Sequence, residues 1–280
     1  MWFWRSVLIE LTASLIAGLA IAGVGALLAA VFFLSRRGRL LKFFGITSAA
    51  GNPSVRIYLS LVSVIKHGAM KADGSRTSVY EGGAVVVDEF LELDTITSLL
   101  GPHAMLKLIP PALLHHLQRR SMNFAHIEVV TRPCPIDPNR LQGDVLIFIG
   151  GPEFNAGTLH YLKRKATLMR FLPEKAGIEI TRGKSAGQRI YPQGEGMNTA
   201  MIERLTSREE GRRVFILAGT GSNGTRAAMR YLRENWERLH KEYGEENFAI
   251  CIQCASRRQD PNGFLRWDVL RVVPQELRAR

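Results

Sequence analysis

The chain has 280 residues, of which 46% are apolar and 22% charged, and its 37 Lys and Arg exceed its 25 Asp and Glu. This composition excludes a wholly disordered chain, and three cysteines over this length exclude a disulfide scaffold. The net charge of +12 suits an anionic ligand, an anionic membrane surface or an ordinary solvated surface. The sequence has no zinc-finger spacing, no RNP motif and no basic recognition helix, so we expect no DNA partner.

An uncharged run of 24 residues extends from Leu11 to Leu34. As a helix it would be about 36 Å long, which exceeds the roughly 30 Å hydrocarbon core of a bilayer. A secretory signal peptide has a shorter apolar core of about 7–15 residues, and the Phe-Phe-Leu that ends the run is a poor cleavage site. The run therefore predicts a retained transmembrane helix, with the lipid bilayer as its partner.

The flanking charges predict the orientation of this helix. Four basic residues lie within residues 36–42, directly after the run, whereas Arg5 precedes it and is offset by Glu10. The excess of Lys and Arg on the C-terminal side places that side in the cytoplasm and the N-terminus outside. We therefore expect a transmembrane anchor over 1–35, a basic juxtamembrane linker over 36–42 and a cytosolic domain over 43–280.

Small residues recur at every fourth position of the predicted span: Ser14, Gly18, Ala22, Ala26 and Ala30. Such a ladder allows two helices to pack closely, which favours a homo-oligomer formed through the transmembrane helix. The high Ala, Gly and Ser content of the span gives the same ladder by chance, so both interpretations stay open.

Strand and helix patterns alternate in the cytosolic part. This alternation predicts an α/β domain with a mostly parallel, doubly wound, Rossmann-like sheet. Right-handed crossovers then place the loops after the strands along one edge, where such folds bind ligands. We expect strands over 55–64, 125–130, 144–149, 177–180, 188–191, 213–218, 248–254 and 267–273, and helical or helix-like segments over 84–100, 104–118, 158–169 and 225–243.

Two strand–loop–helix junctions, at residues 147–158 and 215–225, share one pattern. In each, a buried strand turns on glycine, an Asn follows, and Gly-Thr begins a helix. Glycine lets backbone amides approach a ligand, and a helix N-terminus offers unpaired amides with partial positive charge, so the pattern suits a phosphate. The ligand-binding residues that we predict are Gly150, Gly151, Asn155, Thr158, Gly219, Gly221, Asn223, Gly224, Thr225 and Arg226.

Two other interpretations of these junctions remain. Tight turns with helix caps give the same pattern without any ligand. The run from Gly219 to Gly224 also satisfies G-x-G-x-x-G, but a dinucleotide site would have an acidic residue after the next strand. Arg257 and Arg258 stand there instead, which disfavours a hydride-transfer enzyme.

The paired loops resemble those of the SLOG superfamily, Rossmann-like domains that include the phosphoribohydrolases that activate cytokinins and sensor domains of bacterial conflict systems. The matching pieces are Gly150-Gly151 and residues 219–225, and the resemblance covers about residues 145–260. It implies that the loops hold a nucleotide phosphate. The hydrolytic members place a Glu shortly after the Gly-Thr, whereas this chain has Arg226-Ala227-Ala228, so the resemblance implies binding without hydrolysis.

The run from Gly224 to Met229 also resembles the Gly-Thr-Lys element of CARF domains, which sense cyclic oligoadenylates. A nucleotide or a cyclic oligonucleotide is therefore the expected ligand. Together with the anchor, these loops predict a membrane-bound sensor or effector that couples a nucleotide-type ligand to the membrane helix, in bacterial signalling or antiviral defence.

An enzyme and a ligand-free interaction module are the alternatives. TIR-like and deoxyribosyltransferase-like enzymes use a carboxylate near a strand to act on ribose. If the domain is a membrane-tethered nucleotide or NAD glycohydrolase, Glu89 and Glu92 are the catalytic candidates, although a solvated helix face explains the same acidic cluster. Cys251 and Cys254 form C-x-x-C on a predicted strand, where alternation sends them to opposite faces, so we expect no metal site.

Overall fold

The computed structural model of the chain describes a long N-terminal helix and most of the α/β domain. The described residues are 2–46, 54–70, 76–85, 93, 96–97, 99–100, 126–130, 141–164, 167–172, 177–183, 185–192, 194, 197–207, 210–259 and 265–274. The predicted helix at 104–118 and the candidate residues Glu89 and Glu92 lie outside them.

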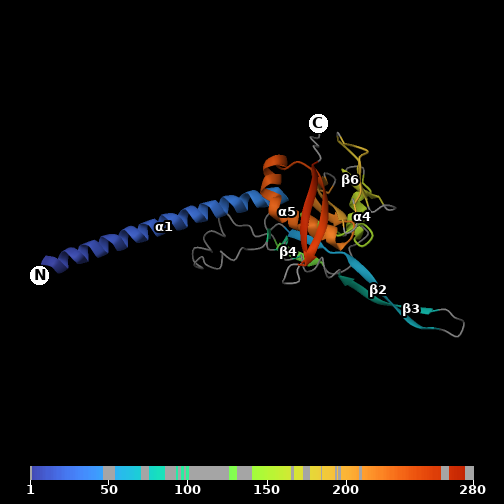
Figure 1. The fold of residues 1–280 in the computed structure, drawn as a ribbon, viewed down its shortest axis with the longest axis horizontal. Coiled ribbons are helices and arrows are strands. Elements are labelled where there is room, and N and C mark those ends of the chain that lie inside the picture. The colour runs from blue at the N-terminus through green and yellow to red at the C-terminus, as the bar shows by residue number, and fades with distance from the viewer. Residues whose placement is uncertain are drawn as a thin grey trace.

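The described elements follow one another in the order drawn in Figure 1. They are α1 (Trp2–Phe44), β1 (Ser54–Tyr58), β2 (Leu61–Met70), β3 (Arg76–Val85), β4 (His126–Val130), β5 (Val145–Ile149), α4 (Ala156–Leu162), β6 (Met169–Leu172), β7 (Gly177–Ile180), β8 (Arg189–Ile190), β9 (Met197–Ser207), β10 (Arg212–Gly219), α5 (Ser222–Tyr243), β11 (Phe248–Gln259) and β12 (Leu265–Pro274).

Within the described residues, the main sheet has seven strands in the order β12-β11-β9-β10-β5-β1-β4. The strands β4, β1, β5 and β10 run parallel to one another, and β9 pairs antiparallel with both β10 and β11. The strand β5 reads Val-Leu-Ile-Phe-Ile and is buried at every position, as a central parallel strand covered on both faces must be. The α/β class and the mostly parallel sheet are thus confirmed, with an antiparallel extension that makes the sheet mixed.

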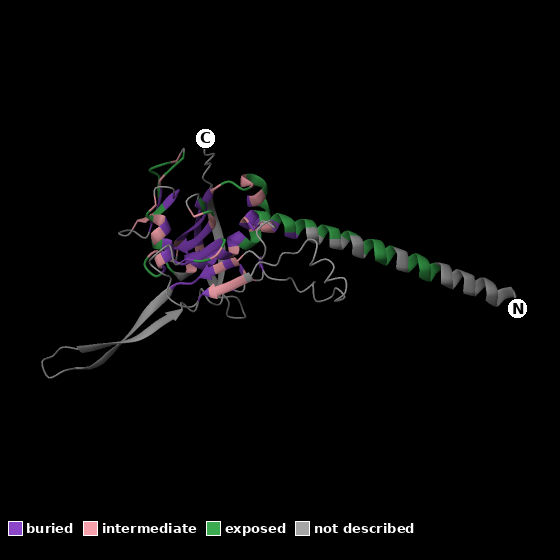
Figure 2. Cartoon of the chain, turned by 180° about the vertical axis from the view of Figure 1, so that it is seen from behind, coloured by how far each residue is buried: buried purple, intermediate pink, exposed green. Residues whose placement is uncertain are grey.

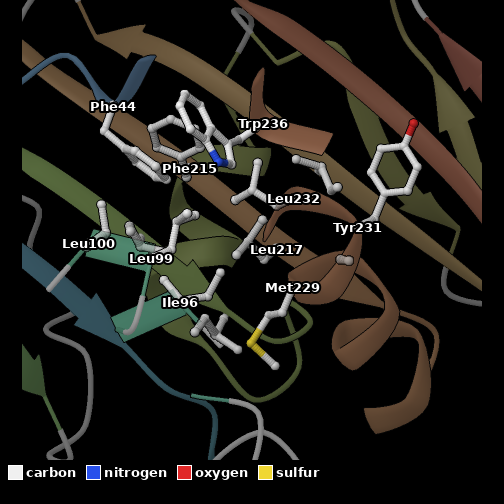
Figure 3. Close-up of a cluster of buried hydrophobic side chains, with 14 of the residues drawn as sticks. Phe44, Ile96, Leu99, Leu100, Phe215, Leu217, Met229, Tyr231, Leu232 and Trp236 are labelled. Atoms are coloured by element: carbon white, nitrogen blue, oxygen red, sulfur yellow. The ribbon is translucent and has the colours of Figure 1, made fainter. Parts of the chain in front are cut away.

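Apolar layers cover both faces of this sheet, because alternate residues of each buried strand point to opposite sides. In β5, Ile147 contacts the layer formed by α5 and the end of α1, whereas Phe148 contacts the layer formed by α4 and the small β6-β7-β8 sheet. Figure 3 shows the first layer, in which Phe44 lies against Phe215 with ring centroids 4.7 Å apart. The domain therefore has three layers, with the sheet as the middle one.

Most predicted strands are confirmed, including the hairpin in which Ile178 of β7 pairs with Ile190 of β8. The strand predicted over 55–64 is two strands, because β1 ends in the main sheet and β2 pairs with β3 in a separate ribbon. The helix-like segment predicted over 158–169 ends at Leu162. No pattern predicted β9, whose sequence mixes Glu, Arg and Thr with apolar residues.

The helix α1 is continuous over 43 residues, so residues 36–42, for which the charge pattern predicts a juxtamembrane linker, form part of its last turns. Leu40, Phe43 and Phe44 are buried in the domain. Large apolar side chains before them are between 57% and 74% exposed: Leu15, Ile16, Ile21, Val24, Leu28, Val31 and Phe32. Figure 2 shows this change from exposed to buried along α1. Among the described residues, the structure has no helix with both the length and the apolarity needed to cross a membrane.

A buried arginine fastens the end of α1 to the domain. The guanidinium of Arg204, on β9, lies between the rings of Phe43 and Phe248, 5.0 and 4.6 Å from their centroids. It donates to the Phe43 carbonyl at 3.1 Å and to the Gly244 carbonyl, just after α5, at 2.9 Å. It also donates to the Glu246 carbonyl from Nε, at 3.0 Å, and from Nη2. One side chain thus joins the C-terminal ends of two helices.

We expect Arg204→Met to lower the free energy of unfolding by about 2–4 kcal/mol, because three carbonyls, one of them buried, lose their donor while the volume is nearly kept. The measurement is denaturant unfolding of the full chain in detergent micelles. Arg233→Met, on the exposed face of α5, is the matched control and should change the value by less than about 0.5 kcal/mol. Equal effects of the two substitutions would contradict the role given to Arg204.

Candidate functional site

The two glycine loops lie side by side at one edge of the sheet. They follow β5 and β10, which are neighbouring parallel strands, so both begin at the same edge. The Gly150 amide donates to the Leu217 carbonyl at 2.9 Å. A Cβ placed on Gly151 would lie 3.7 Å from the Gly219 carbonyl oxygen. The structure therefore brings together the two junctions that the sequence pattern pairs.

The first loop, at 150–158, uses its polar side chains internally. The Asn155 side chain is buried, and its Oδ1 accepts from the amides of Gly157 (3.0 Å) and Thr158 (3.2 Å), which caps α4. Its Nδ2 donates to the last carbonyls of β1 and β5, both at 3.0 Å. The Thr158 hydroxyl donates to the Gly150 carbonyl at 2.9 Å. Asn155 and Thr158, predicted as ligand-binding residues, thus hold the loop closed.

In the second loop, at 219–225, two glycines allow backbone to pack on backbone. A Cβ on Gly219 would lie 2.3 Å from the Gly224 carbonyl carbon, and one on Gly224 would lie 2.7 Å from the Thr199 carbonyl oxygen. Neither position accepts a side chain, so α5 begins directly on the end of β10. Thr225 is buried in the first turn, where its hydroxyl lies 3.4 Å from the Gly221 carbonyl oxygen.

The start of α5 differs from that of α4 in having no side-chain cap. Gly221 is the N-cap, with a φ of +96° that favours glycine, and it makes no side-chain hydrogen bond. The first-turn amides of a helix have no intrahelical acceptor and carry partial positive charge. Gly221 is exposed and Asn223 is half-buried, so solvent reaches this end of α5. Of the two loops, the second therefore keeps the geometry that suits an anion.

Neighbouring polar groups surround this helix start. The Thr199 amide donates to the Thr220 hydroxyl at 3.0 Å, which joins the end of β10 to the start of β9. Asn198, also in β9, has its Oδ1 3.6 Å from the position of a Cβ on Gly221. Sequence reasoning missed Asn198, because only the antiparallel pairing of β9 brings it here. Arg226 is buried, with 8% of its surface exposed.

The described residues give little support to other chemistry. Cys251 and Cys254 belong to opposite core layers, as alternation predicts. Burial raises the pKa of Cys254 to about 11, so the thiol stays protonated at neutral pH. Among the described residues, no three His, Cys, Asp or Glu side chains come together as a metal ion would require. The acidic candidates Glu89 and Glu92 lie outside this part of the chain.

Comparisons with protein-family models, with curated proteins and with solved structures give no match to this chain. The resemblance to SLOG and CARF domains therefore rests on the loop residues alone. The chemistry open to the site follows from its geometry: exposed amide donors at a helix N-terminus, beside a second glycine turn and two asparagines.

A fully buried carboxyl group is a further feature that sequence reasoning missed. Glu203, on β9, accepts a hydrogen bond from the Leu168 amide through Oε1, at 2.6 Å. Its Oε2 has no hydrogen-bond partner among the described residues. Burial raises the pKa of Glu203 to about 8, and the amides of Leu168 and Met169 offset only part of this effect. The group therefore carries a proton at neutral pH.

Glu203 predicts a pH-dependent stability. Between about pH 4.5 and 8 the folded chain keeps a proton that the unfolded chain releases. The free energy of unfolding should therefore fall by about 1.4 kcal/mol for each pH unit of increase in this window, and level off above it. Denaturant unfolding of the full chain at a series of pH values measures this slope. Glu203→Gln should remove that contribution, whereas Glu234→Gln, exposed on α5, should leave it; an unchanged slope in Glu203→Gln would refute the assignment.

Proposed function

We propose that this protein is a membrane-anchored α/β domain that binds a nucleotide-derived phosphate at the start of α5 and couples it to the membrane helix. In this proposal residues 1–35 are the anchor, the N-terminus lies outside, and residues 43–280 lie in the cytoplasm. A nucleotide or a cyclic oligonucleotide is the ligand, and bacterial signalling or antiviral defence is the setting. The observation that carries the ligand site is the uncapped, exposed start of α5 beside the turn at Gly150 and Gly151.

The exposed apolar side chains of α1 support the anchor. Ile21, for example, is 74% exposed, and no charge occurs between Leu11 and Leu34. Moving one large apolar side chain out of water contributes about 1.5–3 kcal/mol. A row of them favours a lipid environment over water by several times that amount. The four basic residues that follow the run favour the proposed orientation.

The helix α5 supports the coupling, because it reaches both regions. It has 22 residues and is therefore about 33 Å long. Its first turn is the proposed phosphate site, and its second half packs against α1, where the rings of Trp236 and Phe43 lie 6.3 Å apart. Glu237 forms an ion pair with Arg36 of α1. A ligand that orders the start of α5 therefore acts on the same helix that holds α1.

The phosphate site predicts a charge-sensitive affinity. The full chain in detergent is screened by thermal unfolding against nucleotides, cyclic oligoadenylates and NAD, and at least one of them should raise the midpoint. Asn223→Asp should weaken that ligand at least tenfold, because it places a negative charge next to the phosphate. The same substitution at Asn235 is the control, about 18 Å farther along α5, and should leave the affinity unchanged.

Three outcomes of this screen oppose the proposal. If no ligand raises the midpoint, or if Asn223→Asp binds as tightly as the natural chain, the start of α5 is not a phosphate site. If chromatography of the incubated mixtures shows that NAD or a nucleotide is cleaved, the glycohydrolase alternative replaces the sensor.

If residues 1–35 are a membrane anchor, alkaline carbonate should not extract the chain from vesicles. Vesicles that contain the full chain should retain it, and Val24→Asp with Leu28→Asp should release it, because each aspartate at the centre of a span costs about 2.5–3.5 kcal/mol. Lys163→Asp with Arg182→Asp, both on the exposed surface of the domain, is the matched control and should stay in the membrane. Release of the natural chain would remove the anchor from the proposal.

A further inference from the structure

A pocket of about 470 Å³ lies where the last turns of α1 meet the second half of α5. It is distinct from the glycine loops, which lie at the other end of α5. Arg39 contributes to it from α1, and five residues contribute from α5: Trp236, Glu237, Arg238, His240 and Lys241. The pocket is thus built by the helix that we propose as the anchor and the helix that carries the phosphate site.

The charges that line the pocket are mostly positive. Glu237 is the acidic lining residue, and it already forms an ion pair with Arg36. Arg238 pairs with Glu242 at 3.1 Å, one turn farther along α5.

Two of its cations are not used by the fold. Arg39 and Lys241 are exposed, and neither has an acidic partner among the described residues. The pocket therefore offers two cations to a ligand, and its chemistry suits a phosphate group.

An aromatic ring gives the pocket an apolar side. Trp236 is buried, with 2% of its surface exposed, and the guanidinium of Arg36 lies 5.8 Å from its ring centroid. The indole is therefore almost entirely covered by protein and forms the floor of the pocket, and the exposed cations are the groups that a ligand meets.

The position of the pocket along α1 matches the depth of lipid headgroups. Arg39 is five residues after Leu34, which is about 7.5 Å along a helix. The headgroup region of a bilayer is about 5–8 Å thick on each side of the hydrocarbon core. If Leu34 ends the span, Arg39 and the pocket beside it lie at the level of the phosphates of the cytoplasmic leaflet.

We propose that this pocket binds the headgroup phosphate of an anionic phospholipid of the cytoplasmic leaflet. The inference rests on the proposed membrane anchor. Arg39 and Lys241 hold the phosphate. The bound lipid joins α1 to α5 and thereby fixes the domain against the membrane surface.

The test uses the full chain in nanodiscs of phosphatidylcholine, with or without phosphatidylglycerol. Phosphatidylglycerol should raise the thermal midpoint of the natural chain by about 5 °C. Arg39→Glu with Lys241→Glu should abolish this rise. Arg39→Gln with Lys241→Gln should reduce the rise, and because glutamine is neutral this pair places no new negative charge on α1 or α5. Lys163→Glu with Arg182→Glu changes the net charge as much as the first pair, away from the pocket, and should keep the full rise.

The outcomes separate this inference from the proposed function. Release of the natural chain by alkaline carbonate removes the anchor and the lipid site together. The lipid site alone is refuted if vesicles retain the chain but phosphatidylglycerol does not raise its thermal midpoint. It is also refuted if the rise is the same in Arg39→Gln with Lys241→Gln as in the natural chain. An equal rise from inorganic phosphate in phosphatidylcholine nanodiscs shows that free phosphate is the ligand and also overturns the inference.

Discussion

The structure depends on a buried cation that is held without a buried anion. Arg204 is enclosed by two aromatic rings, and its donors go to a backbone carbonyl in the last turn of α1 and to carbonyls just after α5. Burial, together with the charge of Arg213, lowers the pKa of Arg204 to about 9, so it stays charged at neutral pH. The carbonyls at helix C-termini carry partial negative charge and replace a carboxylate partner. Because moving the end of α1 away would leave the buried Phe43 carbonyl unpaired and uncover one side of the guanidinium, the end of α1 belongs to the core of the domain.

The two glycine loops show how one sequence pattern gives two results. Each turns on glycine after a buried parallel strand and begins a helix. In the first, Asn155 lies at the N-cap and satisfies the amides of α4. In the second, Asn223 lies inside the first turn and Gly221 takes the N-cap position, so the amides of α5 have no side-chain acceptor. A shift of the asparagine relative to the helix start thus separates a closed turn from one that is open to an anion.

Much of the domain could be predicted because many of its helices and strands have a characteristic pattern of apolar residues within their own sequence. The continuous apolar run of β5 and the apolar spacing of α5 predict these elements, and parallel neighbours place their loops at one edge. The strand β9 could not be predicted, because Glu203 and Arg204 make its sequence polar while the sheet buries both. Their burial depends on partners distant in sequence, the Leu168 amide for Glu203 and the carbonyls after two helices for Arg204. At Asn155 the sequence left a helix cap open as an interpretation, but not the bond from its amide to a carbonyl of β1, a partner distant in sequence.

The helix dipole sets different conditions at the two ends of α5. At its start the dipole attracts an anion, so exposed amides suffice there and few side-chain cations are needed. At its end the dipole repels an anion, and a phosphate nearby needs cations to overcome this repulsion. Arg204 donates to the Gly244 carbonyl just after this end, and in the proposed lipid site Arg39 and Lys241 supply the cations that a phosphate there would need.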